Sequence, residues 1–155
     1  MIAVKEMMTR DVLTFEGNTP VEDIAETLST KHFTGAPVVD TDGHVIGIVS
    51  EVDVFSKKGK VASEIMSANV ISITEDTAVS EAAALLNTRH IRRLPVVSGG
   101  RLVGLVSRSD VLDFFAHTHW VCETCGNTER GLEQPQRCDH CGGTRWRLER
   151  SQPGF

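Results

Sequence analysis

All four cysteines of this 155-residue chain lie within residues 122–141. They form two identical pairs, Cys122-x-x-Cys125 and Cys138-x-x-Cys141, with twelve residues between the pairs. A glycine follows each pair, and glycine allows the positive φ that closes a tight turn whose backbone N–H groups point at sulfur. Two such turns can hold one metal ion in a tetrahedral site of four thiolates. The spacing therefore predicts one metal site with these four cysteines as its ligands.

The identity of the metal stays open between two candidates. Zinc is the first choice and iron the second, because both metals accept four thiolate ligands. Disulfide bonds are disfavoured, since the first ten residues lack the apolar segment of a secretory signal and a cytoplasmic location is therefore expected. His140 lies inside the second pair, but four thiols already complete the coordination. The C-terminal segment that contains the four cysteines is too short to bury enough apolar surface to fold unaided. We therefore expect the metal to supply much of the folding free energy of this segment.

A second pattern that could do chemistry occurs twice, as GIVSEVD and GLVSRSD. Each copy places an aspartate three residues after a serine, at a predicted strand-to-helix junction. The N-terminus of a helix presents free N–H groups to a phosphate, and the hydroxyls of Ser50 and Ser107 add donors there. The carboxylates of Asp53 and Asp110 could accept from both hydroxyls of a ribose. The same spacing is close to a capping box, which any helix start can use, and one residue can serve both roles.

These junctions belong to an internal repeat in the first 116 residues. Three segments, MMTRDVLTF (7–15), KHFTGAPVV (31–39) and GIVSEVDVF (47–55), recur as IMSANVISI (65–73), RHIRRLPVV (89–97) and GLVSRSDVL (104–112). A repeat of this length indicates one supersecondary unit that is used twice.

Each copy begins with a short apolar stretch that predicts a strand, Val12–Phe15 in the first and Val70–Ile73 in the second. An amphipathic helix is expected next in each copy, with Thr19 and Thr77 as the N-caps. Two β-branched runs around a glycine-containing turn then predict a hairpin, and a second helix follows. The predicted order is β-α-β-β-α, an α/β (α+β) fold. Two copies packed with pseudo-two-fold symmetry would cover each other's open apolar face.

The two copies resemble the cystathionine-β-synthase (CBS) domain, and the tandem resembles a CBS pair, or Bateman module. This resemblance implies a regulatory module that binds adenosine-type ligands in clefts between the copies: AMP, ADP, ATP or S-adenosylmethionine. It also implies dimerisation into a flat disc. Family members use the serine and aspartate of the repeated junction for phosphate and ribose, which assigns these roles to Ser50, Asp53, Ser107 and Asp110.

Four further residues are candidates for the ligand. Arg92 and Arg93 precede a predicted buried strand, where family members often place a basic residue against phosphate, although a solvated charged pair explains them too. The first copy has Thr34 at this place, so the two clefts should differ and one nucleotide per chain is expected. Thr14 and Ser72, in the first strands, are candidates for the wall around adenine, which core packing explains equally.

Residues 117–150 resemble a zinc ribbon and, in the geometry of the cysteine turns, a rubredoxin. Rubredoxin turns usually carry proline in or beside the CxxC, and its absence here puts iron in doubt. The combination with a CBS pair resembles archaeal proteins of unassigned role. We expect four segments: repeat 1 in 1–58, repeat 2 in 59–116, the metal domain in 117–150 and a tail in 151–155.

Composition limits the possible partners. The net charge of −5 argues against bulk electrostatic binding to nucleic acid, and residues 117–155 carry five arginines against five acidic residues. The longest apolar runs have the length of strands, so we expect no transmembrane helix and no membrane partner. No pattern indicates a catalytic nucleophile and base, so an enzyme is not expected.

Three functions remain open at this point. The first is a ligand-sensing regulator that acts on an unknown protein partner and forms a homodimer, with the metal domain for stability or docking. The second, not favoured, is a nucleic-acid-associated regulator that uses the ribbon. The third is electron transfer through an iron-loaded four-cysteine site.

Overall fold

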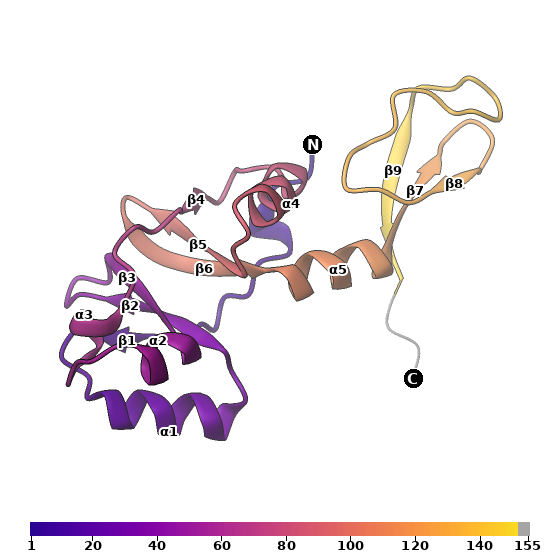
Figure 1. Cartoon of the computed structure of the whole chain (residues 1–155). Helices are drawn as coiled ribbons and strands as arrows, with labels where there is room; N and C mark the ends of the chain where they lie inside the picture. The colour runs from indigo at the N-terminus through magenta and orange to yellow at the C-terminus, as the bar shows by residue number, and fades with distance from the viewer. Residues whose placement is uncertain (152–155) are drawn as a thin grey trace. The chain divides into compact units, whose positions relative to one another are not determined.

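A computed structural model describes residues 1–151 of the chain (Figure 1). Apart from Ser151, the predicted tail at 151–155 lies outside the described residues. The chain divides into two compact units that are each built from separate segments. Unit 1 contains residues 1–8, 76–93 and 106–155, and unit 2 contains residues 9–75 and 94–105.

Both repeats fold in the predicted order. The first contains η1 (Val4–Glu6), β1 (Phe15–Glu16), α1 (Val21–Lys31), β2 (Gly35–Val39), β3 (Val45–Ser50) and α2 (Glu51–Ser56). The second contains α3 (Ala62–Ile65), β4 (Ile73–Thr74), α4 (Val79–Thr88), β5 (Arg93–Ser98), β6 (Arg101–Ser107) and α5 (Arg108–His117). The β-α-β-β-α series is therefore confirmed. The short helices η1 and α3, which open the two repeats at matching positions, were not predicted.

Each repeat contributes one three-stranded sheet, in the orders β1-β2-β3 and β4-β5-β6. The first strand pairs in parallel with the second, as in Phe15 opposite Val38 and Ile73 opposite Val96. The predicted first strands began three residues too early, because pairing starts only where a neighbouring strand lies alongside. The hairpin turns are confirmed, with Gly43, Gly99 and Gly100 at positive φ.

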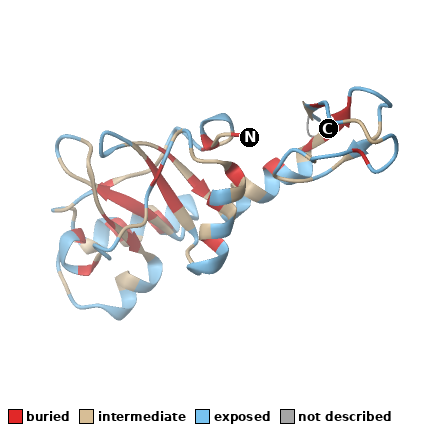
Figure 2. Cartoon of the chain, turned by 90° about the horizontal axis from the view of Figure 1, so that it is seen from above, coloured by how far each residue is buried: buried red, intermediate tan, exposed pale blue. Residues whose placement is uncertain are grey.

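The core of the first repeat forms where α1 packs on β2 and β3. Ile24 and Leu28 of the helix are buried together with Val38 and Val49 of the strands. Burying such apolar side chains is the main force that holds helix to sheet, worth about 1.5–3 kcal/mol per large side chain. In Figure 2, buried residues are concentrated on the strands, and much of the helix surface is exposed.

The predicted threonine N-caps are wrong. The N-cap of α1 is Pro20 and that of α4 is Ala78, and neither makes a side-chain capping bond. Instead the first helical N–H donates to a carbonyl of another segment, Val21 to Lys60 and Val79 to Ile2, at 2.9 and 2.8 Å. A backbone carbonyl from a distant segment thus accepts from the first N–H of each helix, where the sequence predicts capping by a nearby threonine side chain.

The C-terminal segment forms a third sheet in the order β8-β7-β9. Its strands are β7 (Thr118–Cys122), β8 (Thr128–Glu129) and β9 (Trp146–Arg150). Trp120 and Trp146 are buried in this small domain, and the indole N–H of Trp120 donates to the Gly131 carbonyl at 3.1 Å. Within residues 1–151, no helix combines the length and apolar character needed to cross a membrane.

Candidate functional site

The first of the two Ser-x-x-Asp corners lies where β3 meets α2. Ser50 is the N-cap of α2, and its Oγ accepts from the Asp53 N–H at 3.3 Å. The Asp53 carboxylate returns the contact, since its Oδ2 accepts from the Ser50 N–H at 2.8 Å and from the Ser50 hydroxyl at 3.0 Å. This is a complete capping box, so the local reading of the motif is confirmed at this corner.

A lysine occupies the other oxygen of the same carboxylate. Lys57, one turn further along, places its ammonium 2.8 Å from Asp53 Oδ1, and the Asp53 side chain is only 13% exposed. Partial burial acts to raise the pKa of Asp53, but the Lys57 ammonium and the Ser50 donors outweigh it and hold the pKa below its ordinary value. The Glu51 N–H, the first of the helix, donates to the Thr34 carbonyl at 2.9 Å. Groups that could bind a ribose phosphate here are thus engaged by the protein.

The second corner lies where β6 meets α5, and it is built differently. Ser107 is the N-cap, its Oγ accepts from the Asp110 N–H at 3.2 Å, and Asp110 Oδ2 accepts from the Ser107 N–H at 2.9 Å. The Ser107 hydroxyl lies 2.9 Å from that of Ser109. The residue one turn after Asp110 is Phe114, so no lysine can close on the carboxylate from that position.

Helix length separates the two corners further. α5 has ten residues, whereas α2 has six. A longer helix aligns more peptide dipoles and presents a stronger positive end, so the corner of α5 suits an anion better. It also opens onto a pocket of about 230 Å³ that Asp110 helps to line.

The remaining predicted ligand residues divide between the two units. Arg92 and Arg93 belong to unit 1, together with Ser107 and Asp110. Arg92 is exposed directly before β5, and Arg93 is the half-buried first residue of that strand. Thr14 and Ser72 belong to unit 2, which also contains the first corner. Thr14 is half-buried directly before β1, and Ser72 is exposed directly before β4.

The four cysteines come together in the C-terminal sheet, as predicted from their spacing. Their sulfur atoms all lie within 4.8 Å of one another. Cys122 Sγ is 3.6 Å from Cys141 Sγ, and Cys125 Sγ is 3.7 Å from Cys138 Sγ. A tetrahedral site with Zn–S bonds near 2.3 Å requires sulfur atoms about 3.8 Å apart. The donor set therefore fits one four-thiolate metal ion, and the cysteines are free rather than joined in disulfides.

Backbone amides point at these sulfur atoms as well. The N–H groups of Cys125 and Thr124 lower the pKa of Cys122 to about 6, and those of Cys141 and His140 lower the pKa of Cys138. Such donors stabilise a thiolate, which is the form that binds metal. Gly126 and Gly142 adopt the positive φ, 80° and 77°, that the turns require.

The second cysteine of each pair shows the opposite shift. The Asn127 N–H lowers the pKa of Cys125, but burial and the neighbouring thiols of Cys141, Cys138 and Cys122 raise it to about 12. The Gly143 N–H and the Cys125 thiol lower the pKa of Cys141, but burial and the thiols of Cys122 and Cys138 outweigh them and raise it. Four clustered sulfurs cannot all become thiolates without a cation to balance them, as expected of a metal site.

Sequence reasoning missed two side chains that shape these sites. Lys57 could have been found, because it stands at the i+4 position from Asp53 on a predicted helix. Arg150 of β9 lines the pocket beside Asp110, and no local pattern relates these residues, which are forty positions apart.

Comparison with known proteins agrees with this architecture. Residues 4–59 and 62–117 each match the family model of the CBS domain. The inosine-5'-monophosphate dehydrogenase of Thermoplasma acidophilum is 37% identical over 108 residues, which cover 68% of this chain and 22% of that enzyme. This chain thus spans less than a quarter of that relative's length.

Two solved structures are similar over the same region. The crystal structure of CBSX2 in complex with AMP is 30% identical, with a TM-score of 0.69, and covers 72% of this chain and 94% of that one. The CBS domain pair of protein MJ0100, in complex with 5'-methylthioadenosine and S-adenosyl-L-methionine, is 28% identical, also with a TM-score of 0.69. That likeness covers 75% of this chain and 97% of MJ0100.

Proposed function

Because this chain belongs to the CBS domain family, we propose that it is a non-catalytic regulatory module that binds an adenosine-containing ligand and signals to a partner protein. The candidate ligands are AMP, ADP, ATP and S-adenosylmethionine, in line with the ligands of CBSX2 and MJ0100. One observation carries the proposal: the Ser107–Asp110 corner starts a ten-residue helix and opens onto a pocket. We keep a cytoplasmic location as part of this proposal.

The chemistry of that corner suits a ribose phosphate. Asp110 can accept from the ribose hydroxyls, and the start of α5 offers backbone donors and the positive end of a dipole to an anion. Arg92 and Arg93 are the candidate phosphate ligands in the same unit, because a guanidinium fork binds phosphate oxygens in pairs. The first corner is the weaker candidate, since Lys57 and Ser50 already engage Asp53.

Isothermal titration with AMP, ADP, ATP and S-adenosylmethionine tests the proposal. We expect one ligand per chain, and we expect Asp110→Asn to weaken binding at least tenfold, as the loss of a hydrogen bond to a charged group does. Asp53→Asn is the matched control and should change the affinity less than twofold. The proposal is wrong if no ligand binds, or if Asp110→Asn binds as tightly as the natural chain.

We further propose that the four cysteines hold a structural zinc ion. Cys122, Cys125, Cys138 and Cys141 would supply all four ligands, and the ion would supply much of the folding free energy of the small β7–β9 domain. Elemental analysis of the purified protein should give one zinc per chain in a colourless preparation. A red protein with stoichiometric iron would instead support the electron-transfer alternative.

A homodimer forms the last part of the proposal. Each repeat has a groove between its two longer helices. The groove between α1 and α2 has a volume of about 470 Å³, and the groove between α4 and α5 has a volume of about 400 Å³. Phe55 of α2 and Leu112 of α5 occupy equivalent positions of the two repeats. Both side chains are exposed, Phe55 to 76% and Leu112 to 68%. Two like faces on one chain suit a self-complementary contact with a second copy. Light scattering should give a dimer, and Phe55→Ser with Leu112→Ser should give a monomer.

Two arginines of the metal domain are already engaged by the protein and do not favour a nucleic-acid function. Arg147 pairs with Glu149 at 2.8 Å, and Arg130 donates to main-chain carbonyls. Arginines engaged in this way are less available for phosphates of a nucleic acid, and the acidic residues nearby oppose such binding.

A further inference from the structure

The pocket beside Asp110 is not built by the CBS repeat alone. Asp110, Asp113, Phe114 and His117 line it from one face of α5, at the i, i+3, i+4 and i+7 spacing of a single helical stripe. The opposite lining comes from Met7 and from the end of the C-terminal sheet, and includes Arg150 and Ser151. At 1.5 Å per residue, the stripe from the first aspartate to the histidine runs about 10 Å along the helix.

Arg150 is held in place at this pocket by two contacts. Its Nη2 donates to the Glu6 carbonyl at 2.6 Å, and its guanidinium carbon lies 5.6 Å from the centre of the Phe114 ring. Within residues 1–151, these contacts are to a carbonyl and a ring, neither of which carries a charge. A guanidinium has five N–H donors, so one bond to a carbonyl leaves most of them available to an anion.

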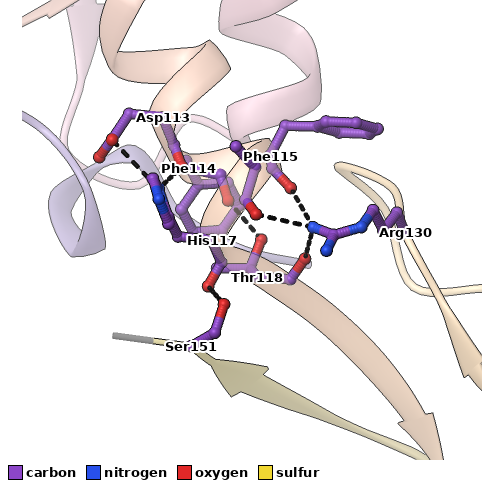
Figure 3. A network of polar contacts seen from close by, with 8 residues as sticks. Asp113, Phe114, Phe115, His117, Thr118, Arg130 and Ser151 are labelled. Atoms are coloured by element: carbon purple, nitrogen blue, oxygen red, sulfur yellow. Dashed lines mark hydrogen bonds and ion pairs between the residues drawn. The ribbon is translucent and has the colours of Figure 1, made fainter. Parts of the chain in front are cut away.

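The C-terminal sheet is fastened to the far end of α5, which fixes Arg150 relative to the helix. Arg130 donates to the carbonyls of Phe115 and Ala116 at 3.2 and 2.8 Å, and so satisfies acceptors that the end of a helix leaves free (Figure 3). Ser151 donates to the His117 carbonyl through its N–H at 2.8 Å and its hydroxyl at 3.1 Å. Figure 3 shows these contacts converging on the turn where α5 passes into β7.

The charges along the pocket differ from one end to the other. Asp110 stands at the helix start, where a ribose can donate to it. Asp113 faces His117 at 3.1 Å, so these two side chains are neighbours of each other. Arg150 is then the cation of the pocket without a carboxylate partner among the described residues. An anion on a ligand that reaches along the groove would meet it.

We propose that Arg150, a residue of the metal domain, is part of the ligand site and binds the anionic group that an adenosine ligand carries on its 5' side. This inference rests on the proposed function for the ribose at Asp110, and it assigns the 5' anion to Arg150 in place of the start of α5 and of Arg92 and Arg93. The anion could be the phosphate of AMP or the carboxylate of S-adenosylmethionine, since a guanidinium fork recognises both. The pocket volume of about 230 Å³ is below the roughly 300–1,000 Å³ of whole ligand sites, so it would take the ribose and 5' group rather than the base.

The test compares charged and neutral ligands on matched variants. Arg150→Gln removes the charge and keeps a donor for the Glu6 carbonyl, whereas Arg147→Gln changes an arginine of the same strand that does not line the pocket. Titrations use AMP and S-adenosylmethionine against adenosine and 5'-methylthioadenosine, which lack the anion. We expect Arg150→Gln to weaken at least one anionic ligand about tenfold or more and both neutral ligands less than twofold. Arg147→Gln should bind all four as the natural chain does.

The pattern of losses identifies the anion and separates the two proposals. A loss for AMP alone assigns a phosphate, and a loss for S-adenosylmethionine alone assigns the carboxylate. Unchanged binding of both anionic ligands by Arg150→Gln overturns the role of Arg150 and leaves the proposed function standing. Equal losses for charged and neutral ligands also overturn it, since they indicate altered structure. If the natural chain binds none of the four, the role of Arg150 is overturned; if it also binds neither ADP nor ATP, the proposed function is overturned with it. Arg150→Lys keeps the charge and should retain more affinity than Arg150→Gln. This comparison shows whether a loss of affinity in Arg150→Gln comes from the missing charge or from misfolding of that variant.

Discussion

The two Ser-x-x-Asp corners have nearly the same sequence and the same capping box, yet they offer a ligand different surfaces. At the first corner, Lys57 and Ser50 engage the carboxylate of Asp53, and the helix has only six residues. At the second, α5 is ten residues long and Phe114 takes the place of the lysine. A duplicated motif therefore yields one corner whose carboxylate a lysine engages and one whose carboxylate borders a pocket. The difference lies in residues outside the motif.

The second corner is also the one whose helix leads into the C-terminal sheet. The end of α5 continues into β7, and Arg130 and Ser151 bind its last carbonyls. The C-terminal sheet and the pocket beside Asp110 are thus connected through the same helix. The first corner belongs to unit 2, which does not contain the C-terminal sheet.

Removal of the metal should give the largest effect and should affect the second corner alone. Structural zinc contributes about 10–16 kcal/mol to small metal domains, so its loss should unfold the β7–β9 sheet. Trp120 and Trp146, the two tryptophans of the chain, are both buried there, and their fluorescence should shift to the red after chelation or in Cys138→Ser. Ligand affinity should fall in parallel. An unchanged emission spectrum after verified metal removal would contradict a structural role for the ion.

Removal of each aspartate should separate the corners by stability. We expect Asp53→Ala to lower the free energy of unfolding by about 1–2 kcal/mol, because the capping box and the contact to Lys57 are lost together. Asp110→Ala removes a capping box without a lysine contact at the i+4 position, so we expect a cost of about 1 kcal/mol. Denaturant titration without ligand measures both values. Equal losses would show that the two corners are energetically alike.

The stabilising effect of Asp53 should depend on pH in a defined window. The folded-state pKa of Asp53 lies below its ordinary value of 3.8, so the unfolded chain binds this proton more readily. The stability that the carboxylate contributes is therefore complete above pH 3.8 and is lost as the pH falls through the folded pKa. The difference in unfolding free energy between the natural chain and Asp53→Asn should stay constant near neutrality and shrink below pH 3.8. A gap that narrows already near pH 6 would contradict this assignment.

Lys57→Met should have the smallest effect and would make the corners more alike. Lys57 is 48% exposed although Asp53 is not, so its ion pair should be worth about 1 kcal/mol and stability should fall by about that amount. The change frees Asp53 Oδ1, and titration should then detect a second, weaker ligand per chain. Lys58→Met, next in the sequence, is the control and should leave the stoichiometry unchanged. If Lys57→Met also binds one ligand, something other than the lysine disables the first corner.

The sequence by itself determined the parts of this protein that depend on local spacing. The repeat predicted the β-α-β-β-α order, and the paired cysteines predicted a cluster whose sulfur atoms the fold brings within 4.8 Å. The Ser-x-x-Asp spacing left capping open beside ligand contact, and capping boxes are present at both corners. Periodicity, turn glycines and i, i+3 contacts are set by residues near one another in the chain, so a single sequence displays them.

Tertiary structure alone decided which of the similar parts are equivalent. It replaced the predicted threonine caps with the carbonyls of Lys60 and Ile2, which come from distant segments. It placed Arg150 at the pocket of Asp110, although forty residues separate them. Such contacts depend on how strands and helices pack after the chain has folded back on itself, and spacing along the chain does not encode them.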